Sequence, residues 1–224
     1  GLDNIAWLLN IRGDDILYTP LVFSYLLISK NHKSFLYIKH DKINDKLKIE
    51  LEKYINIQSI EDINDIFSKI DKDDIVGLDF STTTYFFLKQ LENLDIQYKD
   101  ITNPIILSKA VKNQTEQIGA INANLRDGVS VTRYIYWLKN KIDLKATSEL
   151  SASKYLRDLR VKNNLFHSLS FDTISAFGKN AALPHYRVDE ISNTYFKKNN
   201  IYLVDSGAQY FDGTTDITRT IIIG

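Results

Sequence analysis

Two aspartates near the end of the chain have residue types and a spacing that suit metal-ion chemistry. Asp205 follows an apolar segment, residues 201–204, and Asp216 lies within a Thr-rich segment, residues 214–223. If these segments pair as neighbouring β-strands, the two carboxylates come together, with Asp216 on the same face as the threonines at alternate positions. Two carboxylates on one face repel each other unless a cation or a shared proton intervenes. The pair therefore predicts a site for divalent ions.

Carboxylate oxygens are ligands that manganese, magnesium and zinc accept. Two such ions about 3.5–4 Å apart can share a bridging carboxylate, which is the layout of two-metal hydrolases. From spacing alone, turn-capping aspartates in an ordinary hairpin are the commoner explanation, because Asp and Gly are frequent turn residues. Asp212, followed by Gly213, fits that turn interpretation, and we place it outside the candidate site.

His185 follows Pro184 shortly before the acidic segment and is a candidate catalytic residue. A neutral imidazole can donate a hydrogen bond to a developing oxyanion or transfer a proton. Taken alone, however, a loop histidine satisfied by the backbone is the simpler explanation. The other histidines lie in polar stretches and are expected at the surface; they are His32, His40 and His167.

The elements that must position these residues fall into two segments. Residues 1–103 alternate short β-branched and aromatic runs with helical patterns, which favours a small α/β domain. The expected strands are residues 23–28, 35–39, 75–80 and 96–101. Apolar residues at helical spacing predict helices around residues 43–51 and 63–70, and Ser81 is expected to cap a third through residue 94.

The second segment begins at Pro104, because the residue before a proline is pushed out of the helical region. Asn113 with Glu116 is typical of a capped helix start, and an apolar stripe from Ile118 continues this helix toward Trp137. A second helix is expected from Thr147 or Ser148. Strands are then expected at residues 171–177, 201–205 and 214–223, so residues 104–224 form two helices that lead into a sheet.

Composition excludes several other classes of function. The chain has 28 Lys and Arg against 28 Asp and Glu, so no net charge attracts it to nucleic acid or an anionic membrane. No apolar run approaches the roughly 20 residues of a membrane-spanning helix. The absence of cysteine removes disulfides and thiolate nucleophiles. Because the chain contains no Met, we expect a piece of a longer polypeptide.

The motif VDSGAQYFDGTTDITRT, residues 204–220, closely resembles the metal-binding strand pair of the Xaa-Pro aminopeptidases, which are pita-bread metallopeptidases related to creatinase and prolidase. Three further motifs resemble this family: LDNIAWLLNIRGD (residues 2–14), SKAVKNQTE (residues 108–116) and PHY (residues 184–186). The resemblance thus extends over the whole chain. It implies a creatinase-like second domain over residues 1–103 and the first part of a pita-bread catalytic domain over residues 104–224.

Residue by residue, the resemblance implies that Asp205 holds one metal ion, that Asp216 bridges two, and that His185 contacts the substrate or the tetrahedral intermediate. The implied reaction is hydrolysis of the bond between an N-terminal residue and a following proline by a hydroxide between two ions, with manganese expected. In the family, a histidine and two glutamates further downstream complete the ligand set. We therefore expect the 224 residues alone to be inactive.

The resemblance also implies peptide substrates with proline at the second position and a homodimer, and we expect a cytoplasmic location. Two alternatives stay open. One is a prolidase, which cleaves Xaa-Pro dipeptides with the same ligands. The other is a non-catalytic pita-bread module that binds peptides or histones; such modules generally lose the metal carboxylates, whereas Asp205 and Asp216 are both present.

Overall fold

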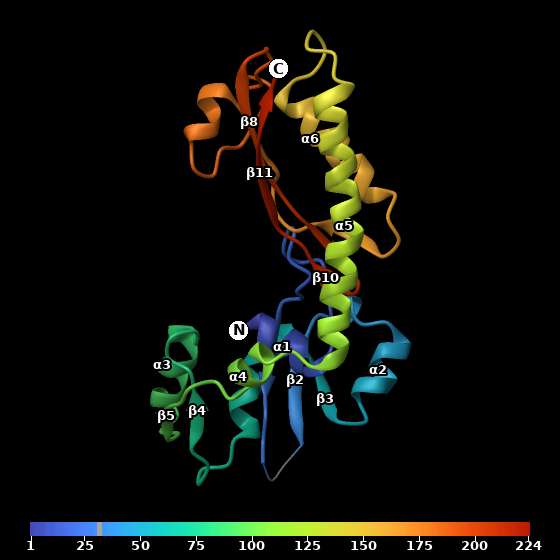
Figure 1. The fold of residues 1–224 in the computed structure, drawn as a ribbon. Helices are drawn as coiled ribbons and strands as arrows, with labels where there is room; N and C mark the ends of the chain where they lie inside the picture. The colour runs from blue at the N-terminus through green and yellow to red at the C-terminus, as the bar shows by residue number, and fades with distance from the viewer. Residues whose placement is uncertain (31–32) are drawn as a thin grey trace. The chain divides into compact units, whose positions relative to one another are not determined.

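The computed structural model describes residues 1–30 and 33–224, and Figure 1 shows the helices and strands along the chain. Contacts between residues divide the chain into two compact units. The first comprises Gly1–Ile16 and Pro20–Val111, and the second comprises Leu17–Thr19 and Lys112–Gly224. The assignment of residues 1–103 and 104–224 to separate domains stays a prediction.

The first unit is built on two small sheets. In one sheet β2 pairs with β1 in the antiparallel and with β3 in the parallel sense; in the other, β4 and β5 are parallel. Helices connect β2 to β3, β3 to β4 and β4 to β5, so the predicted alternation of strands and helices is confirmed, with β3 as an additional strand that was not predicted from the sequence. The elements are α1 (Leu2–Leu9), β1 (Ser24–Leu27), β2 (Ser34–Ile38), η1 (His40–Lys42), α2 (Asp45–Leu51), β3 (Ile55–Ser59), η2 (Ile60–Lys69), β4 (Val76–Leu78), α3 (Tyr85–Asn93), β5 (Tyr98–Asp100) and α4 (Ile105–Ala110).

Two clusters of buried apolar side chains stabilise the first unit, one on each face of β2. Leu36 packs in a cluster with Leu51 of α2, whereas Tyr37 packs in a cluster with Leu91 of α3. Successive side chains of a strand point to opposite faces, so β2 has apolar neighbours on both sides. This explains why its sequence is almost continuously apolar.

The predicted cap at Ser81 is wrong. Helix α3 begins at Tyr85 with Thr84 as its N-cap, and Thr84 makes no capping hydrogen bond with its side chain. The main-chain N–H of Ser81 instead donates to the Asp79 carboxylate at 3.0 Å, and the Ser81 hydroxyl donates to the same oxygen. Asp79 therefore forms a turn after β4 that delays the helix by one turn.

The second unit contains two helices and two three-stranded antiparallel sheets. The sheet orders are β10-β9-β6 and β11-β8-β7. Helix α5 packs against α6 and β10, and α6 packs against β6 and β7. The elements are α5 (Gln114–Asn140), α6 (Glu149–Val161), β6 (Phe166–Leu169), β7 (Ile174–Phe177), η3 (Gly178–Ala182), β8 (Asn200–Ser206), β9 (Ala208–Tyr210), β10 (Gly213–Thr214) and β11 (Ile217–Ile223).

Both predicted helix starts in the second unit are confirmed. Asn113 and Glu116 form a reciprocal capping box at the start of α5, and Ser148 caps α6. Such caps satisfy main-chain N–H groups that have no partner within the helix. Because the cap residues lie within one helical turn of each other, local sequence is sufficient to predict them.

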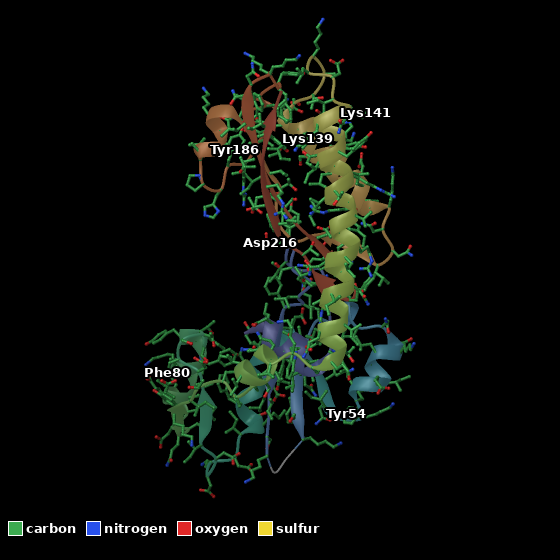
Figure 2. All side chains as sticks on the ribbon, viewed as in Figure 1. Tyr54, Phe80, Lys139, Lys141, Tyr186 and Asp216 are labelled. Atoms are coloured by element: carbon green, nitrogen blue, oxygen red, sulfur yellow. The ribbon has the colours of Figure 1, made fainter. Side chains whose placement is uncertain are left out.

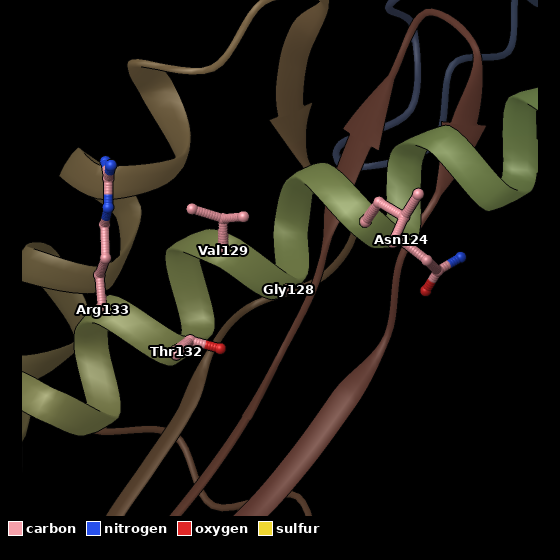
Figure 3. A pocket seen from close by; sticks show the side chains of 6 residues that line it. Asn124, Gly128, Val129, Thr132 and Arg133 are labelled. Atoms are coloured by element: carbon pink, nitrogen blue, oxygen red, sulfur yellow. The ribbon is translucent and has the colours of Figure 1, made fainter.

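The apolar stripe of α5 lies on the exposed side of the helix. Ile118, Ile121, Leu125 and Val129 are each at least half exposed, and Thr132, which continues the predicted stripe, is exposed as well. Leu125, Gly128 and Val129 line an open hollow on this side (Figure 3). The opposite side of α5 is buried, partly through small residues. At Gly119 a Cβ atom would collide with the main-chain oxygen of Asp212, so the helix approaches the turn before β10 as closely as a glycine allows.

Candidate metal centre

Strand β8, which contains Asp205, and strand β11, which begins directly after Asp216, pair as predicted. In the antiparallel ladder of β8 with β11, Asp205 lies opposite Thr218 and Ser206 lies opposite Ile217. On β8, Tyr202 and Val204 belong to the buried core, so alternation directs Asp205 to the other face. On β11, Ile221 and Ile223 belong to the same core. Asp216 and Thr218 are exposed, as alternation with these core positions requires.

The register of this pair continues beyond β8 and β11. Tyr210 lies opposite Gly213, so β9 and β10 extend the same hairpin on the other side of a short interruption. Extending the register into the interruption places Asp216 opposite Gly207. Asp205 and Asp216 are then diagonal neighbours on one face, which in a regular ladder lie roughly 7–8 Å apart. The structure thus brings together the two aspartates that the sequence singles out.

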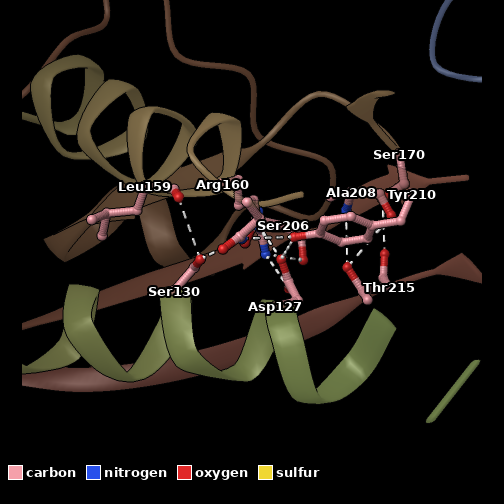
Figure 4. Close-up of polar contacts among 10 residues, drawn as sticks. Asp127, Ser130, Leu159, Arg160, Ser170, Ser206, Ala208, Tyr210 and Thr215 are labelled. Carbon is pink, nitrogen blue, oxygen red and sulfur yellow. Dashed lines mark hydrogen bonds and ion pairs between the residues drawn. The ribbon is translucent and has the colours of Figure 1, made fainter. Parts of the chain in front are cut away.

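The predicted continuous strand over residues 214–223 is wrong, because it is interrupted at Thr215 and Asp216. Figure 2 labels Asp216, and Figure 4 shows the polar contacts of Thr215. The Thr215 N–H still donates to the Ala208 oxygen at 2.9 Å, but the Ala208 N–H donates to the Thr215 hydroxyl at 3.0 Å. The Thr215 carbonyl instead accepts from the Ser170 hydroxyl at 2.9 Å. A side chain therefore replaces one main-chain bond, and the hairpin passes from one sheet to the other at this point.

Gly207 is required at the same interruption. A Cβ atom on Gly207 would collide with the Thr215 carbonyl oxygen and with the Ser170 hydroxyl. The main-chain oxygen of Gly207 also accepts from the Ser170 N–H at 3.2 Å. The bend that places Asp216 beside β8 therefore depends on a residue without a side chain.

The Asp205 carboxylate has the environment of a metal ligand. Its Oδ1 atom is buried and has no hydrogen-bond donor among the residues that the structure describes. A buried carboxylate oxygen without a partner costs roughly 1–3 kcal/mol or more, and a cation in contact with it removes that cost. Asp216 is exposed, and its carboxylate accepts no hydrogen bond from residues 1–30 or 33–224. Two oxygen donors of this kind fit a hard divalent ion.

These two aspartates are an incomplete ligand set. Among residues 1–30 and 33–224, no three His, Cys, Asp or Glu side chains are arranged to hold a metal ion. The aspartates therefore fit as two members of a larger set. The expectation from the family resemblance, that further ligands lie outside the chain, stays a prediction.

A buried ion pair supports β8 from its core side (Figure 4). The Arg160 guanidinium donates to both carboxylate oxygens of Asp127, at 2.7 and 2.9 Å, and to the main-chain oxygen of Ser206 at 3.4 Å. Tyr210 donates its hydroxyl to Asp127 at 2.9 Å, and burial beside this carboxylate raises the pKa of Tyr210. Arg160 thus links α5 and α6 to the residue that follows Asp205.

Asp212 lies in the turn between β9 and β10, as predicted. Both of its carboxylate oxygens accept from the Arg126 guanidinium at 2.9 Å. These hydrogen bonds hold the pKa of Asp212 below its ordinary value. The Asp212 carboxylate is therefore committed to an ion pair with α5, and it lies outside the candidate metal centre.

His185 lies in the exposed loop between η3 and β8, with a left-handed φ of 56°. In the described part of the chain, no hydrogen bond or ion pair joins His185 to Asp205 or Asp216. Its role therefore stays a prediction. His40 and His167 are exposed, as expected, whereas His32 lies outside the described residues.

Glu149 is a buried acidic residue that the sequence did not single out. Its side chain lies in the first turn of α6, is fully buried, and accepts four hydrogen bonds. The donors are the Phe177 N–H at 2.6 Å, the Asn180 amide at 3.0 Å, the Tyr186 hydroxyl at 3.0 Å and the Thr194 N–H at 2.9 Å. In the sequence, Glu149 is indistinguishable from any acidic residue that favours a helix N-terminus. Only the fold shows that its donors come from a segment remote in the chain.

The two units and the hairpin with its paired aspartates define a mixed α/β protein of two parts, and matches to family models assign each part. Residues 1–116 match the model of the creatinase/prolidase N-terminal domain, and residues 120–224 match metallopeptidase family M24. The chain belongs to the creatinase/prolidase family. The predicted fold class, a small α/β unit followed by the helices and sheet of a pita-bread domain, is confirmed.

Similar proteins include Xaa-Pro aminopeptidase 1 of Dictyostelium discoideum, which is 39% identical over 229 residues, covering all of this chain and 36% of that protein. A probable Xaa-Pro aminopeptidase P of Aspergillus niger is 38% identical, covering all of this chain and 38% of that protein. The chain thus spans little more than a third of these relatives.

Among solved structures, the X-prolyl aminopeptidase of Caenorhabditis elegans, described as a cytosolic enzyme with a di-nuclear active site, matches with a TM-score of 0.81. It is 30% identical, over 99% of this chain and 37% of that one. A prolidase from Pyrococcus furiosus, at 20% identity and a TM-score of 0.69, shares the fold. Across residues 1–30 and 33–224, no helix has both the length and the apolar content needed to cross a membrane.

Proposed function

We propose that the polypeptide containing these residues is a metal-dependent aminopeptidase that removes an N-terminal residue when proline follows it. The observation that carries the proposal is the pair Asp205 and Asp216, diagonal neighbours on the face of the hairpin away from the core. The buried Oδ1 of Asp205, which has no hydrogen-bond donor among the described residues, supports a cation there. The names of the relatives, which are Xaa-Pro aminopeptidases at 37–39% identity, support the substrate class.

Each candidate residue has a distinct part in this proposal. Asp205 would hold one divalent ion and Asp216 would contact two, with the other ligands supplied by residues outside the chain. The ions would supply an activated water and polarise the scissile carbonyl. His185 would donate a hydrogen bond from its ring to the oxygen on which negative charge develops.

Three finer features belong to the same proposal. A centre of two ions is supported by the di-nuclear active site named for the C. elegans enzyme, and we propose manganese for both ions. A cytoplasmic location is supported by the description of that enzyme as cytosolic. The homodimer is proposed from the family resemblance alone.

The test compares substrates with and without added manganese, in the longest natural polypeptide that contains these residues. We expect metal-dependent release of the N-terminal residue from an Xaa-Pro-Xaa tripeptide, and none from an Xaa-Ala-Xaa control. Asp216→Asn should abolish this release. Asp158→Asn is the matched control, because Asp158 is exposed on α6 and has no hydrogen bond or ion pair with another described residue. The isolated 224 residues should be inactive.

Other outcomes would point to the alternatives. Preference for an Xaa-Pro dipeptide over the tripeptide would establish a prolidase. If the folded, metal-loaded protein cleaved none of these peptides, the proposal of an enzyme would be refuted and a binding module favoured. Turnover by a verified 224-residue polypeptide would refute the view that its ligand set is incomplete.

A further inference from the structure

We infer that Glu149 is a positioning residue that fixes the loop carrying His185, so that the orientation of His185 depends on one buried carboxylate. This inference rests on the proposed function, in which the His185 ring faces the substrate. It goes beyond that function because it assigns a role to a residue that is remote from His185 in the sequence.

The hydrogen bonds of Glu149 close the loop at both ends. Oε1 accepts from the Phe177 N–H and the Asn180 amide, which lie where the chain leaves β7. Oε2 accepts from the Tyr186 hydroxyl and from the Thr194 N–H, at the returning end. The main chain adds to this closure, since the Glu149 N–H donates to the Thr194 oxygen at 3.1 Å. Residues 177–194 are therefore gathered around a single carboxylate group.

The direct link to His185 passes through Tyr186. The Tyr186 hydroxyl contacts Glu149 Oε2 at 3.0 Å, and Tyr186 is buried while His185 is exposed. In the described part of the chain the His185 ring has no hydrogen bond of its own. Its direction is therefore set by its main chain, whose left-handed φ of 56° is uncommon for residues other than glycine, although His, Asn and Asp adopt it more readily than most. The anchored tyrosine next in the chain holds this conformation.

Closing the loop through a buried carboxylate is energetically less favourable than closing it through neutral groups. Its carboxylate is fully buried, and within residues 1–30 and 33–224 no Lys or Arg pairs with it. Burying a charge is unfavourable unless several donors surround it, and four do so here. The helix N-terminus at which Glu149 lies adds a favourable electrostatic contribution. The carboxylate therefore fixes two main-chain N–H groups and two side chains of the loop from different directions. Precise placement of a catalytic side chain requires a loop that is fixed in this way.

The test uses Tyr186→Phe, which removes one hydroxyl of the anchor and keeps the ring, in the same natural polypeptide loaded with manganese. Tyr195→Phe is the matched control: Tyr195 lies in the same loop, and its hydroxyl makes no hydrogen bond within the described residues. We expect Tyr186→Phe to lower kcat on the tripeptide about tenfold, with KM within about twofold, because a displaced catalytic group chiefly affects the transition state. Tyr195→Phe should leave both constants unchanged, and Glu149→Gln should lower kcat further.

A double-mutant cycle separates positioning from general destabilisation. If Tyr186 acts through His185, Tyr186→Phe should cause no further loss of kcat in a His185→Ala background. An equal loss in both backgrounds, or an equal effect of Tyr195→Phe, would overturn the inference while leaving the aminopeptidase intact.

An NMR measurement distinguishes failure of the inference about Glu149 from failure of the proposed function. If the wild-type protein cleaves no peptide, the function fails. The NMR signal of the His185 ring then decides the inference on its own. A shift in Tyr186→Phe and none in Tyr195→Phe would support it, and an unchanged signal in both would overturn it.

Discussion

The buried Asp127–Arg160 pair gives a quantitative test of how the second unit is stabilised. Asp127→Asn keeps the shape of the side chain but removes its charge and turns an amide toward one donor of Arg160. The guanidinium is fully buried, and it then has two acceptors left: the Ser206 oxygen at 3.4 Å and the single amide oxygen of the new Asn side chain. Its Nη1 atom already lacks a partner among the described residues.

The expected cost is large. Removing one partner of a buried ion pair costs about 3–5 kcal/mol, because the other charge stays buried without compensation. This is a substantial part of the 5–15 kcal/mol that stabilises a typical domain. Replacing both partners with apolar residues, as in Asp127→Leu with Arg160→Met, should recover roughly half of the loss or more. The exposed Arg187–Asp172 pair, at 3.7 Å, provides the control, since Arg187→Gln should cost less than about 1 kcal/mol.

The two tryptophans of the chain make the assay specific to the second unit. Trp7 belongs to the first unit and Trp137 to the second, where it stacks on Tyr134. In the 224-residue polypeptide with Trp7→Phe, Trp137 is the only tryptophan, so urea unfolding followed by fluorescence reports the free energy of unfolding of the second unit. A loss below about 1 kcal/mol for Asp127→Asn would refute the reasoning, because it would mean that water solvates the guanidinium in the folded protein.

Two further predictions concern the hairpin. The pKa of Asp212 is lowered chiefly by its hydrogen bonds from Arg126, so its contribution to stability should be present above the unfolded-state pKa and be lost as pH falls through the lower folded-state pKa. An NMR titration of the Asp212 carboxyl should show this pKa returning toward 3.8 in Arg126→Gln, and an unchanged titration would contradict the assigned cause. Gly207→Ala should destabilise the second unit by about 1–3 kcal/mol or more in urea unfolding, because its Cβ would collide with the Thr215 oxygen. Gly128→Ala is the control with the opposite sign: a Cβ there meets no atom of the described residues within 4 Å, so the better helix propensity of alanine should stabilise α5 by up to about 1 kcal/mol. Equal effects of the two substitutions would show that the bend tolerates a side chain.

Features that depend on neighbours in the sequence were predictable. The capping box of Asn113 with Glu116 and the start of α6 at Ser148 follow from residues within one turn of each other. The pairing that joins the Asp205 and Asp216 segments is likewise a local hairpin. Because these two strands are adjacent in the sequence and each shows an alternation of apolar and polar residues, their pairing could be predicted.

Features that depend on remote partners were not predictable. The interruption at Thr215 arises because the Ser170 hydroxyl takes the carbonyl that the ladder would otherwise use. Strand β6 went unpredicted because its short sequence, Phe166–Leu169, lacks a clear run of apolar residues. Asp127 and Glu149 look like ordinary helix residues, and only the fold reveals that Arg160 and the residues around His185 surround them.

The order in which the chain folds follows from the hairpin that contains β8, β9, β10 and β11. Its two arms are adjacent in the sequence, and one short turn at Phe211 and Asp212 joins them. Hairpins of this kind close within about 1–10 μs, well before strands that are distant in the sequence find each other. The relative placement of Asp205 and Asp216 is therefore set by an early, local event. The loop around Glu149 needs contacts between remote segments, so His185 should reach its final orientation later than the two carboxylates.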